Sequence, residues 1–339
     1  MRILIVGGSG LISQYITRQL LARGDEVVWF NRGQSSCAIA LPNEPRTLVG
    51  DRHDESAFEA AVRGHGPWDA VIDMIGYQPG EVTSLLRAVE GVAGHLVFCS
   101  TVDVYAKPYP ILPVREDSPL GRNNAYSAGK IACEELLAEA HAAGRIPTTV
   151  IRPAHTYGEG RSFFGSYMNG GLYLDRLRRG KPILVHGDGQ SLWTACHGDD
   201  VARAFLGALD NPTARGRAYH VTAEEWLTWN RYHELAAEAL GAPAPTLVHV
   251  PSALLARLNP ARCGICLDNF QFDNIFDNSA ARADLGFSYT IPFVEGVRQV
   301  VAWLEAHGGL ADSDADDGED AIIAAWQAAC ERLVAEAAR

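Results

Sequence analysis

The sequence has no apolar run long enough to cross a bilayer, and its first apolar stretch, ILIV, is too short for the core of a signal peptide. Basic residues are also scarce: 29 Lys and Arg stand against 41 Asp and Glu, giving a net charge of -12. Nucleic-acid binders need clustered basic side chains to neutralise phosphates. We therefore expect a cytoplasmic protein with neither a membrane nor a nucleic acid as partner.

The chain also lacks the cysteine pattern of a disulfide framework or a zinc site. Its seven cysteines are odd in number and scattered over a long chain, which fits reduced thiols. Cys263 and Cys266 form one CxxC pair, but there is no second pair and no histidine at zinc-ligand spacing nearby. We expect these cysteines to be small buried residues and predict no metal site.

The sequence does contain a regular alternation of short apolar runs with helical segments. The expected strands are RILIV, EVVWF, TLVG, DAVIDMI, HLVFCS and TTVIRP. Helices are expected between them, in ISQYITRQLLARG and near residues 55–63, 82–89 and 125–143. Strands separated by helices need crossover connections, which give a parallel sheet covered on both faces. The sequence thus predicts an α/β fold with a doubly wound, Rossmann-type parallel sheet.

The alternation ends after Pro153, and this change suggests the domain organisation. Residues 1–153 are expected to form mainly the dinucleotide-binding Rossmann domain. Residues 154–308 are expected to form mainly a smaller, mixed α/β substrate lobe, without excluding that some segments return to the sheet. Residues 309–321 are acidic and poor in large apolar residues, which is typical of a solvated linker. Residues 322–339 predict a last helix with an apolar face.

A glycine-rich turn after the first strand is the candidate cofactor site. Gly7, Gly10 and Ser13 occupy the positions of a GxxGxxG pattern. The glycines let the backbone approach a pyrophosphate, whose charge would meet the helix dipole and the first amides, at Leu11 and Ile12. The third position sets how closely helix and strand pack, and serine is only slightly larger than glycine. A purely structural turn is the alternative.

The end of the second strand bears on the choice between NAD and NADP. Proteins that choose NAD usually place an Asp or Glu there, whereas this chain has Asn31 and Arg32. A neutral amide followed by a guanidinium would accept a 2′-phosphate, which favours NADP modestly. A surface arginine is the alternative. Asp51, after the third strand, could accept a hydrogen bond from the adenine amino group or could serve as an acid near a helix N-terminus.

Three further motifs follow in order: STVDVY at 100–105, YSAGK at 126–130 and RPAHTYG at 152–158. Together with the glycine turn and Asp51, they resemble the extended short-chain dehydrogenase/reductase family, in its NAD-dependent epimerase/dehydratase branch, as far as about residue 307. The resemblance implies NAD or NADP as cofactor, a sugar or nucleotide-sugar substrate, and a homodimer formed through two helices beside the active-site helix.

The expected catalytic groups are Tyr126, Lys130 and Thr101. Tyr126 and Lys130 are one helical turn apart, so both project from one face. A neighbouring ammonium and an oxidised nicotinamide would favour the phenolate, which could then take a proton from a hydroxyl as hydride leaves its carbon. In the resemblance, Lys130 also holds the nicotinamide ribose, Thr101 hydrogen-bonds the reacting oxygen, and Ser100 lies at the cofactor.

Departures from the family pattern bear on the reaction and on the substrate. Dehydratases of the family carry Thr-Asp-Glu, whereas this chain reads Thr101-Val102-Asp103, so it lacks the acid needed for elimination. Asp103 could remove a proton alpha to a ketone, orient the substrate or cap a loop. His155 stands where many relatives have a substrate-contacting asparagine; it could bind a sugar, act as an acid/base or be buried and satisfied.

Trp193 replaces the arginine with which nucleotide-sugar epimerases often bind a diphosphate. Indole offers one donor and a stacking face in place of a bidentate guanidinium. Arg161, or the arginines at 176, 178 and 179, could compensate; the latter group could equally be a solvated helix end. The substrate is thus a nucleotide sugar bound in another way, or a sugar or nucleoside without a diphosphate.

The first hypothesis from the sequence is an NAD(P)-dependent epimerase that works through a transient keto sugar. Tyr126 would be the base, with Asp103 and His155 as second-stage groups. The alternative is an NADPH-dependent reductase or dehydrogenase of a keto sugar or related carbonyl, which Arg32 would suit. A third hypothesis is a nucleotide-sensing or scaffold protein without turnover, against which the intact Thr101, Tyr126 and Lys130 speak.

Overall fold

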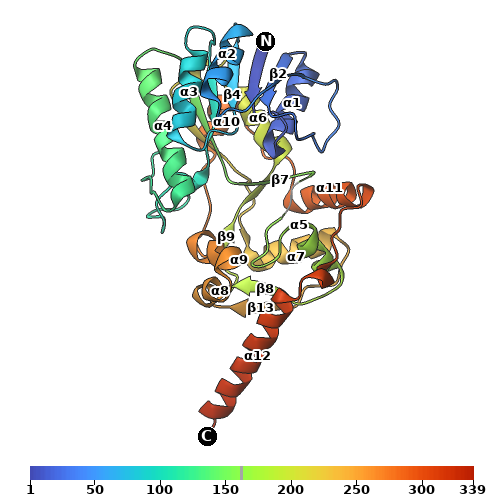
Figure 1. Cartoon of the computed structure of the whole chain (residues 1–339). Helices are drawn as coiled ribbons and strands as arrows, with labels where there is room; N and C mark the ends of the chain where they lie inside the picture. The colour runs from blue at the N-terminus through green and yellow to red at the C-terminus, as the bar shows by residue number, and fades with distance from the viewer. Residues whose placement is uncertain (161–162) are drawn as a thin grey trace. The chain divides into compact units, whose positions relative to one another are not determined.

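A seven-stranded parallel sheet organises the chain, with strand order β11-β6-β5-β4-β1-β2-β3 (Figure 1). The computed structural model describes residues 1–160 and 163–339. The strands are β1 (Arg2–Val6), β2 (Glu26–Asn31), β3 (Arg46–Val49), β4 (Ala70–Asp73), β5 (Leu96–Cys99), β6 (Thr148–Pro153) and β11 (Ala218–Val221). Because successive strands run outward from β1 in both directions, the sheet is doubly wound. The predicted fold class is confirmed.

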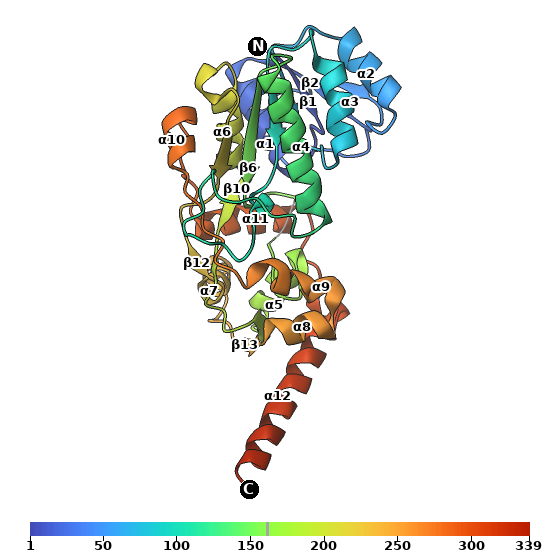
Figure 2. The same ribbon diagram turned by 90° about the vertical axis from the view of Figure 1, so that its left-hand side faces the viewer.

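Helices cover both faces of this sheet, which explains why its strands are apolar nearly throughout. On one face, the core side chains come from α1 (Leu11–Arg23), α6 (Gly198–Ala208) and α10 (Ser279–Leu285). On the other face they come from α2 (Glu55–Gly64), α3 (Pro79–Val89) and α4 (Ala125–Ala142). Figure 2 shows α6 and α10 on one side of the sheet and α2 and α3 on the other.

Capping side chains fix where two helices of the second face begin. Asn124 caps α4 by accepting a hydrogen bond from the Ser127 amide at 2.9 Å, and the Ser127 hydroxyl is 3.1 Å from the Asn124 amide. Pro79 stands in the first turn of α3, and the Glu81 carboxylate accepts from the Gln78 amide at 2.8 Å. These caps satisfy amides that have no intrahelical partner, so the two helices start at defined residues beside the ends of β4 and β5.

The chain forms two compact units. The first contains residues 1–157, 195–224 and 276–291, and the second contains residues 158–194, 225–275 and 292–339. The first unit also holds a parallel pair of short strands, β7 (His155–Tyr157) and β10 (Ala195–His197), and the 3-10 turns η1 (Val102–Val104) and η2 (Pro212–Ala214). The chain therefore returns twice to the first unit after leaving it, and the first return supplies the edge strand β11.

The second unit is mixed. Its strands form two pairs, namely β9 (Leu192–Trp193) with β12 (Leu227–Thr228) and β8 (Ile183–His186) with β13 (Leu247–Val250). Its helices are α5 (Gly170–Arg178), α7 (Trp229–Ala239), α8 (Ser252–Leu258), α9 (Pro260–Ile265), α11 (Phe293–Ala306) and α12 (Gly318–Ala337), with the π turn η3 (Cys266–Phe270) and the 3-10 turn η4 (Ser313–Ala315). No helix within the described ranges is both long and apolar enough to span a membrane.

The acidic stretch expected as a solvated linker is instead bound to the second unit by ion pairs. The Arg179 guanidinium pairs with Asp312 at 2.8 Å and with Asp314 at 2.5 Å. Arg176, which has no exposed surface, donates to Asp320 at 2.5 Å. The carboxylates compensate the basic end of α5, so the stretch is held in place and the last helix begins at Gly318 rather than at residue 322.

Candidate active site

The glycine turn is built as a tight link between β1 and α1. Gly7 has φ +88°, a conformation that side chains other than glycine rarely adopt. The Ser13 hydroxyl donates to the Gly7 carbonyl at 2.6 Å, so the serine that replaces the third glycine ties the helix back to the turn. Gly10 caps α1 without a side-chain hydrogen bond, and the first turn of α1 contains no acidic residue. The start of α1 thus presents its dipole without a competing carboxylate.

The three glycines have different surroundings. A Cβ at Gly8 would lie 2.1 Å from the Trp29 ring, and one at Gly7 would lie 2.6 Å from Ile75. A Cβ at Gly10 would meet only Ser13 Oγ at 3.3 Å and the Gly7 carbonyl at 3.8 Å. Gly7 and Gly8 are therefore needed for packing, whereas Gly10 leaves bare backbone at the helix start. This bare start fits a dinucleotide pyrophosphate, which approaches backbone closely.

This difference predicts opposite outcomes for two alanine substitutions. Gly10→Ala should leave the melting temperature within a few degrees and weaken cofactor binding about 10-fold or more, because its methyl group fills the space above the helix start. Gly8→Ala should destabilise the fold by about 1–3 kcal/mol through overpacking against Trp29. Isothermal titration with NADH and NADPH, together with thermal melts, separates the two. Unchanged cofactor affinity in Gly10→Ala would contradict a site at this turn.

The residues proposed for the adenosine end lie at the carboxyl ends of β2 and β3. The Asn31 side-chain oxygen accepts from the Gly33 amide at 2.8 Å, and Arg32 is exposed beside it. The Asp51 carboxylate accepts from the His53 amide at 2.9 Å and is also exposed. Asp54, not Asp51, caps α2. In α1, Leu11 and Ile12 contribute side chains to the core, so only their backbone would face a phosphate.

The three expected catalytic residues come together at the carboxyl end of β5. Thr101 follows that strand, is 8% exposed and caps η1 by accepting from the Asp103 amide at 3.2 Å. Tyr126 stands in the first turn of α4 with 42% of its surface exposed, and the Thr101 side chain is near enough to act on the pKa of its phenol. Two hydroxyls thus meet at the sheet edge, where doubly wound folds bind their ligands.

Lys130 lies one turn further along α4 and is buried. Its ammonium donates to the Cys99 carbonyl at 2.7 Å and to the Gly76 carbonyl at 2.8 Å. It therefore clamps the ends of β4 and β5 together beneath the two hydroxyls. Gly76 is required at this point, because a Cβ there would lie 2.6 Å from the Asp73 carboxylate and 2.7 Å from the Phe98 ring.

The charge balance at Tyr126 differs from the expectation. We expected Lys130 to favour the phenolate, but the protein raises the pKa of Tyr126 above its usual value. Burial is the largest cause, the charges of Cys99 and Asp103 act in the same direction, and the hydrogen bond with Thr101 opposes them. The reason is geometric: the Lys130 ammonium is directed at two backbone carbonyls. The chain's own groups thus hold Tyr126 as a phenol.

The sequence model of the "NAD dependent epimerase/dehydratase family" matches residues 3–222. The chain belongs to this family. It is 30% identical over 315 residues to a 2'-dehydrokanamycin reductase of Streptomyces kanamyceticus, covering 93% of this chain and 87% of the relative. A UDP-glucose 4-epimerase of Mycolicibacterium smegmatis is 26% identical, covering 90% of this chain and 98% of the relative.

Solved structures agree on the fold of this epimerase/dehydratase family. A UDP-glucose-4-epimerase from Stenotrophomonas maltophila with bound NAD and formylated UDP-arabinopyranose superposes with a TM-score of 0.74 at 20% identity, covering 91% of this chain and 99% of that one. The resemblance to the extended short-chain dehydrogenase/reductase family is confirmed. The chain is accordingly an NAD(P)-dependent enzyme of this type.

Two family positions have partners that the sequence did not reveal. The Lys107 ammonium donates to the Asp103 carboxylate at 2.8 Å, so the carboxylate is part of an ion pair. The Ser100 hydroxyl donates to the Glu134 carboxylate, which turns its side chain into the protein interior. The Ser100 hydroxyl is thus occupied by Glu134, and the place of Ser100 at the cofactor stays a prediction. An i,i+4 spacing could have suggested Lys107, whereas Glu134 is reached only through tertiary packing.

The residues expected to bind the substrate differ in their surroundings. Burial lowers the pKa of His155 to about 3, so its imidazole is neutral near pH 7, and its role toward the substrate stays a prediction. Arg161 lies outside the described residues. Trp193 is 5% exposed and packs against Trp229 and Phe270, with ring centroids 5.0 Å from each. It is a core residue of the second unit, because its indole packs among these aromatic rings.

The arginines considered as substitutes for the diphosphate-binding residue are engaged in ion pairs. Arg178 donates to Asp175 at 2.8 Å, and Arg176 and Arg179 hold the acidic stretch described above. Their place in the second unit is explained by these carboxylates. The structure supports the alternative interpretation, in which these arginines belong to a helix end. Acidic residues compensate their charge.

Tyr77 is a residue at this edge that sequence reasoning missed. It is 44% exposed, its ring centroid lies 6.3 Å from that of Tyr126, and the Lys130 ammonium lies 4.7 Å from its ring centroid. Its amide donates to the Glu81 carboxylate at 2.6 Å, which fixes the turn. An exposed aromatic residue directly after a buried strand was the available signal. Tyr77 forms a wall beside the catalytic hydroxyls.

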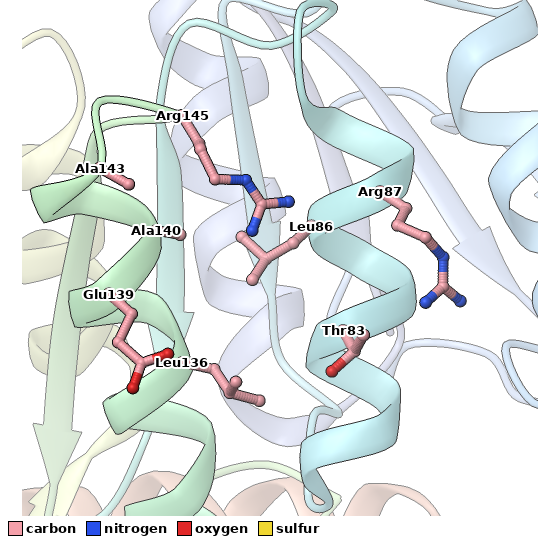
Figure 3. A pocket seen from close by; sticks show the side chains of 8 residues that line it. All are labelled: Thr83, Leu86, Arg87, Leu136, Glu139, Ala140, Ala143 and Arg145. Atoms are coloured by element: carbon pink, nitrogen blue, oxygen red, sulfur yellow. The ribbon is translucent and has the colours of Figure 1, made fainter.

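A groove between α3 and α4 lies elsewhere (Figure 3). It has a volume of about 330 Å³ and is lined by Thr83, Leu86, Arg87, Leu136, Glu139, Ala140, Ala143 and Arg145. None of these residues belongs to the catalytic group. The groove therefore does not represent the family's active site.

Proposed function

We propose that the chain is an NAD(P)-dependent reductase of a keto group on a sugar. The observation that carries this proposal is the pair of neighbouring hydroxyls, Thr101 and Tyr126, at the sheet edge beside the buried Lys130. A phenol is protonated at neutral pH, so Tyr126 can donate a proton to a nascent alkoxide. The relative that reduces 2'-dehydrokanamycin, matched over 93% of this chain, supports the same direction.

Each residue then has a defined task. The bound nicotinamide supplies hydride to the carbonyl carbon. Tyr126 donates its proton to the carbonyl oxygen, and Thr101 holds that oxygen through a hydrogen bond. Lys130 fixes the strand ends through its two carbonyl contacts. The Asp103–Lys107 pair keeps a carboxylate beside Tyr126, which opposes loss of the phenol proton between turnovers.

Epimerisation of a sugar or nucleotide sugar is the second candidate. It is favoured by the match to UDP-glucose 4-epimerase over 90% of this chain. Its first half-reaction needs Tyr126 as a base, which the raised pKa disfavours unless the positive nicotinamide offsets it. Asp103 and His155 would then be the candidate groups for the second half-reaction.

We infer a modest preference for NADPH from Asn31 and the exposed Arg32. Arg32→Ala should weaken NADPH binding about 10-fold and leave NADH binding unchanged, because a guanidinium contacts a phosphate more strongly than a hydroxyl. Arg46→Ala, an exposed arginine at the start of β3, is the matched control. Titrations with both cofactors give the ratio. Equal losses for NADH and NADPH would contradict a role in 2′-phosphate recognition.

The remaining parts of the proposal concern partners. Position 193 is a tryptophan and not an arginine. A sugar lacking a diphosphate therefore suits the site as well as a nucleotide sugar does. The homodimer and the cytoplasmic location stay proposals that rest on the resemblance and on the composition. Light scattering of the purified chain tests the dimer.

The function is tested by the fate of the cofactor. The purified chain is incubated with NADPH and a keto sugar, once free and once nucleotide-linked, and separately with UDP-glucose without added cofactor. Consumption of NADPH in proportion to keto sugar supports the reductase. Tightly retained oxidised cofactor, with conversion of UDP-glucose to UDP-galactose and no net consumption, would replace it by the epimerase. Turnover in neither assay would contradict both.

A further inference from the structure

A chain of buried polar side chains lies directly behind the two catalytic hydroxyls. It runs from the end of β5 through α4 and β6 to β11, all within the first unit. Its members are each less than a tenth exposed, namely Ser100, Tyr105, Glu134, Arg152 and His220. None of them is assigned a role in the proposed reaction.

The hydrogen bonds in this chain are continuous. The Ser100 hydroxyl donates to the Glu134 carboxylate. Arg152 donates to the two oxygens of Glu134, from Nε at 3.1 Å and from Nη2 at 2.5 Å, in a bidentate pair. The Nη1 group of Arg152 donates to the Tyr105 hydroxyl at 2.6 Å.

The last link fixes the direction of the donors. His220 Nδ1 is 3.1 Å from the Asp277 carbonyl, which can only accept, so that nitrogen carries the proton. His220 Nε2 is then an acceptor, and the Tyr105 hydroxyl donates to it at 2.5 Å. The imidazole is neutral, since burial lowers the pKa of His220 to about 3. The donor and the acceptor are therefore defined for every hydrogen bond in this row of side chains.

This row of buried polar side chains connects the two elements that hold the reacting hydroxyls. Glu134 lies on α4 one turn beyond Lys130 and two turns beyond Tyr126, on the same face. Ser100 immediately precedes Thr101. Tyr105, held by Arg152, closes η1, the turn that Thr101 starts. The separation between Thr101 and Tyr126 is therefore spanned on the inner side by Glu134 and Arg152.

Stability alone does not account for charges at this place, because a buried ion pair is often no more stable than apolar side chains of similar size. We propose that Glu134 and Arg152 are positioning residues that set the distance between the hydroxyls of Thr101 and Tyr126. This rests on the proposed function, in which both hydroxyls contact one oxygen of the substrate. A displacement of about 1 Å at such a contact can reduce a rate about 100-fold.

The test removes the three members next to the catalytic hydroxyls without leaving an unpaired charge. The triple variant Ser100→Ala/Glu134→Leu/Arg152→Met replaces them with apolar groups and keeps the Tyr105–His220 hydrogen bond. The control Arg122→Met/Glu135→Met removes an exposed ion pair, with a contact of 3.0 Å, from the outer side of the same helix. Ser100→Ala alone breaks only the link to the strand end and leaves the ion pair intact. It keeps the proposal testable if the triple variant fails to fold.

Three measurements are made on each variant: kcat and KM for the keto sugar with NADPH, NADPH affinity, and amide hydrogen exchange of residues 100–105. In the triple variant we expect kcat to fall about 10- to 100-fold, with KM and NADPH affinity within about threefold. Exchange at residues 100–105 should rise about 10-fold, because the turn loses its inner support. Ser100→Ala should show the same pattern with a smaller loss, and the control should match the wild type.

Wild-type kcat and wild-type exchange in the triple variant, or in Ser100→Ala where the triple variant does not fold, would overturn the proposal. So would a loss confined to the melting temperature, which is what a merely structural pair would give. If the wild-type chain reduces no keto sugar, the proposed function fails, and hydrogen exchange at residues 100–105 still decides whether the buried chain holds that turn.

Discussion

Tyr126→Phe is expected to lower kcat by about 10²- to 10⁴-fold, the usual contribution of a positioned proton donor. The phenylalanine ring keeps the packing of the first turn of α4 and removes only the hydroxyl beside Thr101. The Lys130 contacts to the Cys99 and Gly76 carbonyls do not involve this hydroxyl. NADPH affinity should therefore stay within about twofold of the wild type.

Steady-state kinetics on the keto sugar, with a separate fluorescence titration of NADPH, measures both quantities. Tyr219→Phe is a matched control, because its hydroxyl is bonded to Asp284 at 3.0 Å in the edge strand β11. The control should retain kcat. A Tyr126→Phe enzyme with more than about a third of wild-type kcat would show that the proton comes from another group.

The free energy of unfolding is expected to fall steeply as the pH drops below about 6.5, the pKa of histidine in an unfolded chain. Burial depresses the pKa of five histidines, to about 3 for His155, His220 and His233 and to about 4 for His95 and His186. Below pH 6.5 the unfolded chain binds protons that these buried rings do not, so the native state loses stability. Above pH 6.5 they contribute no pH dependence.

The size of the effect follows from the linkage relation. Each depressed histidine contributes up to about 1.4 kcal/mol per pH unit between the unfolded and folded pKa values. Five such groups from pH 6.5 to 5 give an upper bound near 10 kcal/mol, comparable with the whole stability of a typical domain. Glu319 opposes this trend, because burial raises its pKa to about 7 and it takes up a proton on folding in the same range. Burial also raises the pKa of Glu116. Two carboxyls do not offset five imidazoles.

Urea denaturation at pH 7, 6 and 5 measures the slope. His233→Gln should reduce the slope of unfolding free energy against pH by up to about 1.4 kcal/mol per unit, whatever its effect at pH 7. His53→Gln, at an exposed position with its side chain 73% accessible, should leave the slope unchanged. A midpoint that is constant between pH 7 and 5 would contradict the buried neutral state of these histidines.

Much of the sheet could be predicted from the sequence because its strands are apolar and separated by helices of regular length. The same reasoning did not identify β11, since AYHV is short and its partner β6 is separated from it in the sequence by four strands and by α5 and α6. DAVIDMI is shorter as a strand than its apolar length suggested, ending at Asp73. There the Asp73 carboxylate accepts a hydrogen bond from Arg52 at 2.9 Å, a contact that no local sequence pattern indicates.

The candidate site shows the same division. The spacing of Tyr126 and Lys130 predicts one helical face, and the structure places both at the end of β5. The direction of the Lys130 ammonium, the ion pair at Asp103 and the inward turn of Ser100 depend on groups that are distant in the sequence. The packing of Trp193 could not be predicted, because its aromatic neighbours come from segments beyond residue 225.

The placement of β11 has a consequence for synthesis of the chain. A ribosome completes the first six strands of the parallel sheet well before it reaches residues 218–221. Until then the backbone of β6 presents an unpaired edge, which is a template for association with other nascent chains. Cotranslational folding should therefore be protected by chaperones in this interval, and a fragment ending at residue 157 should form larger assemblies than the full chain does.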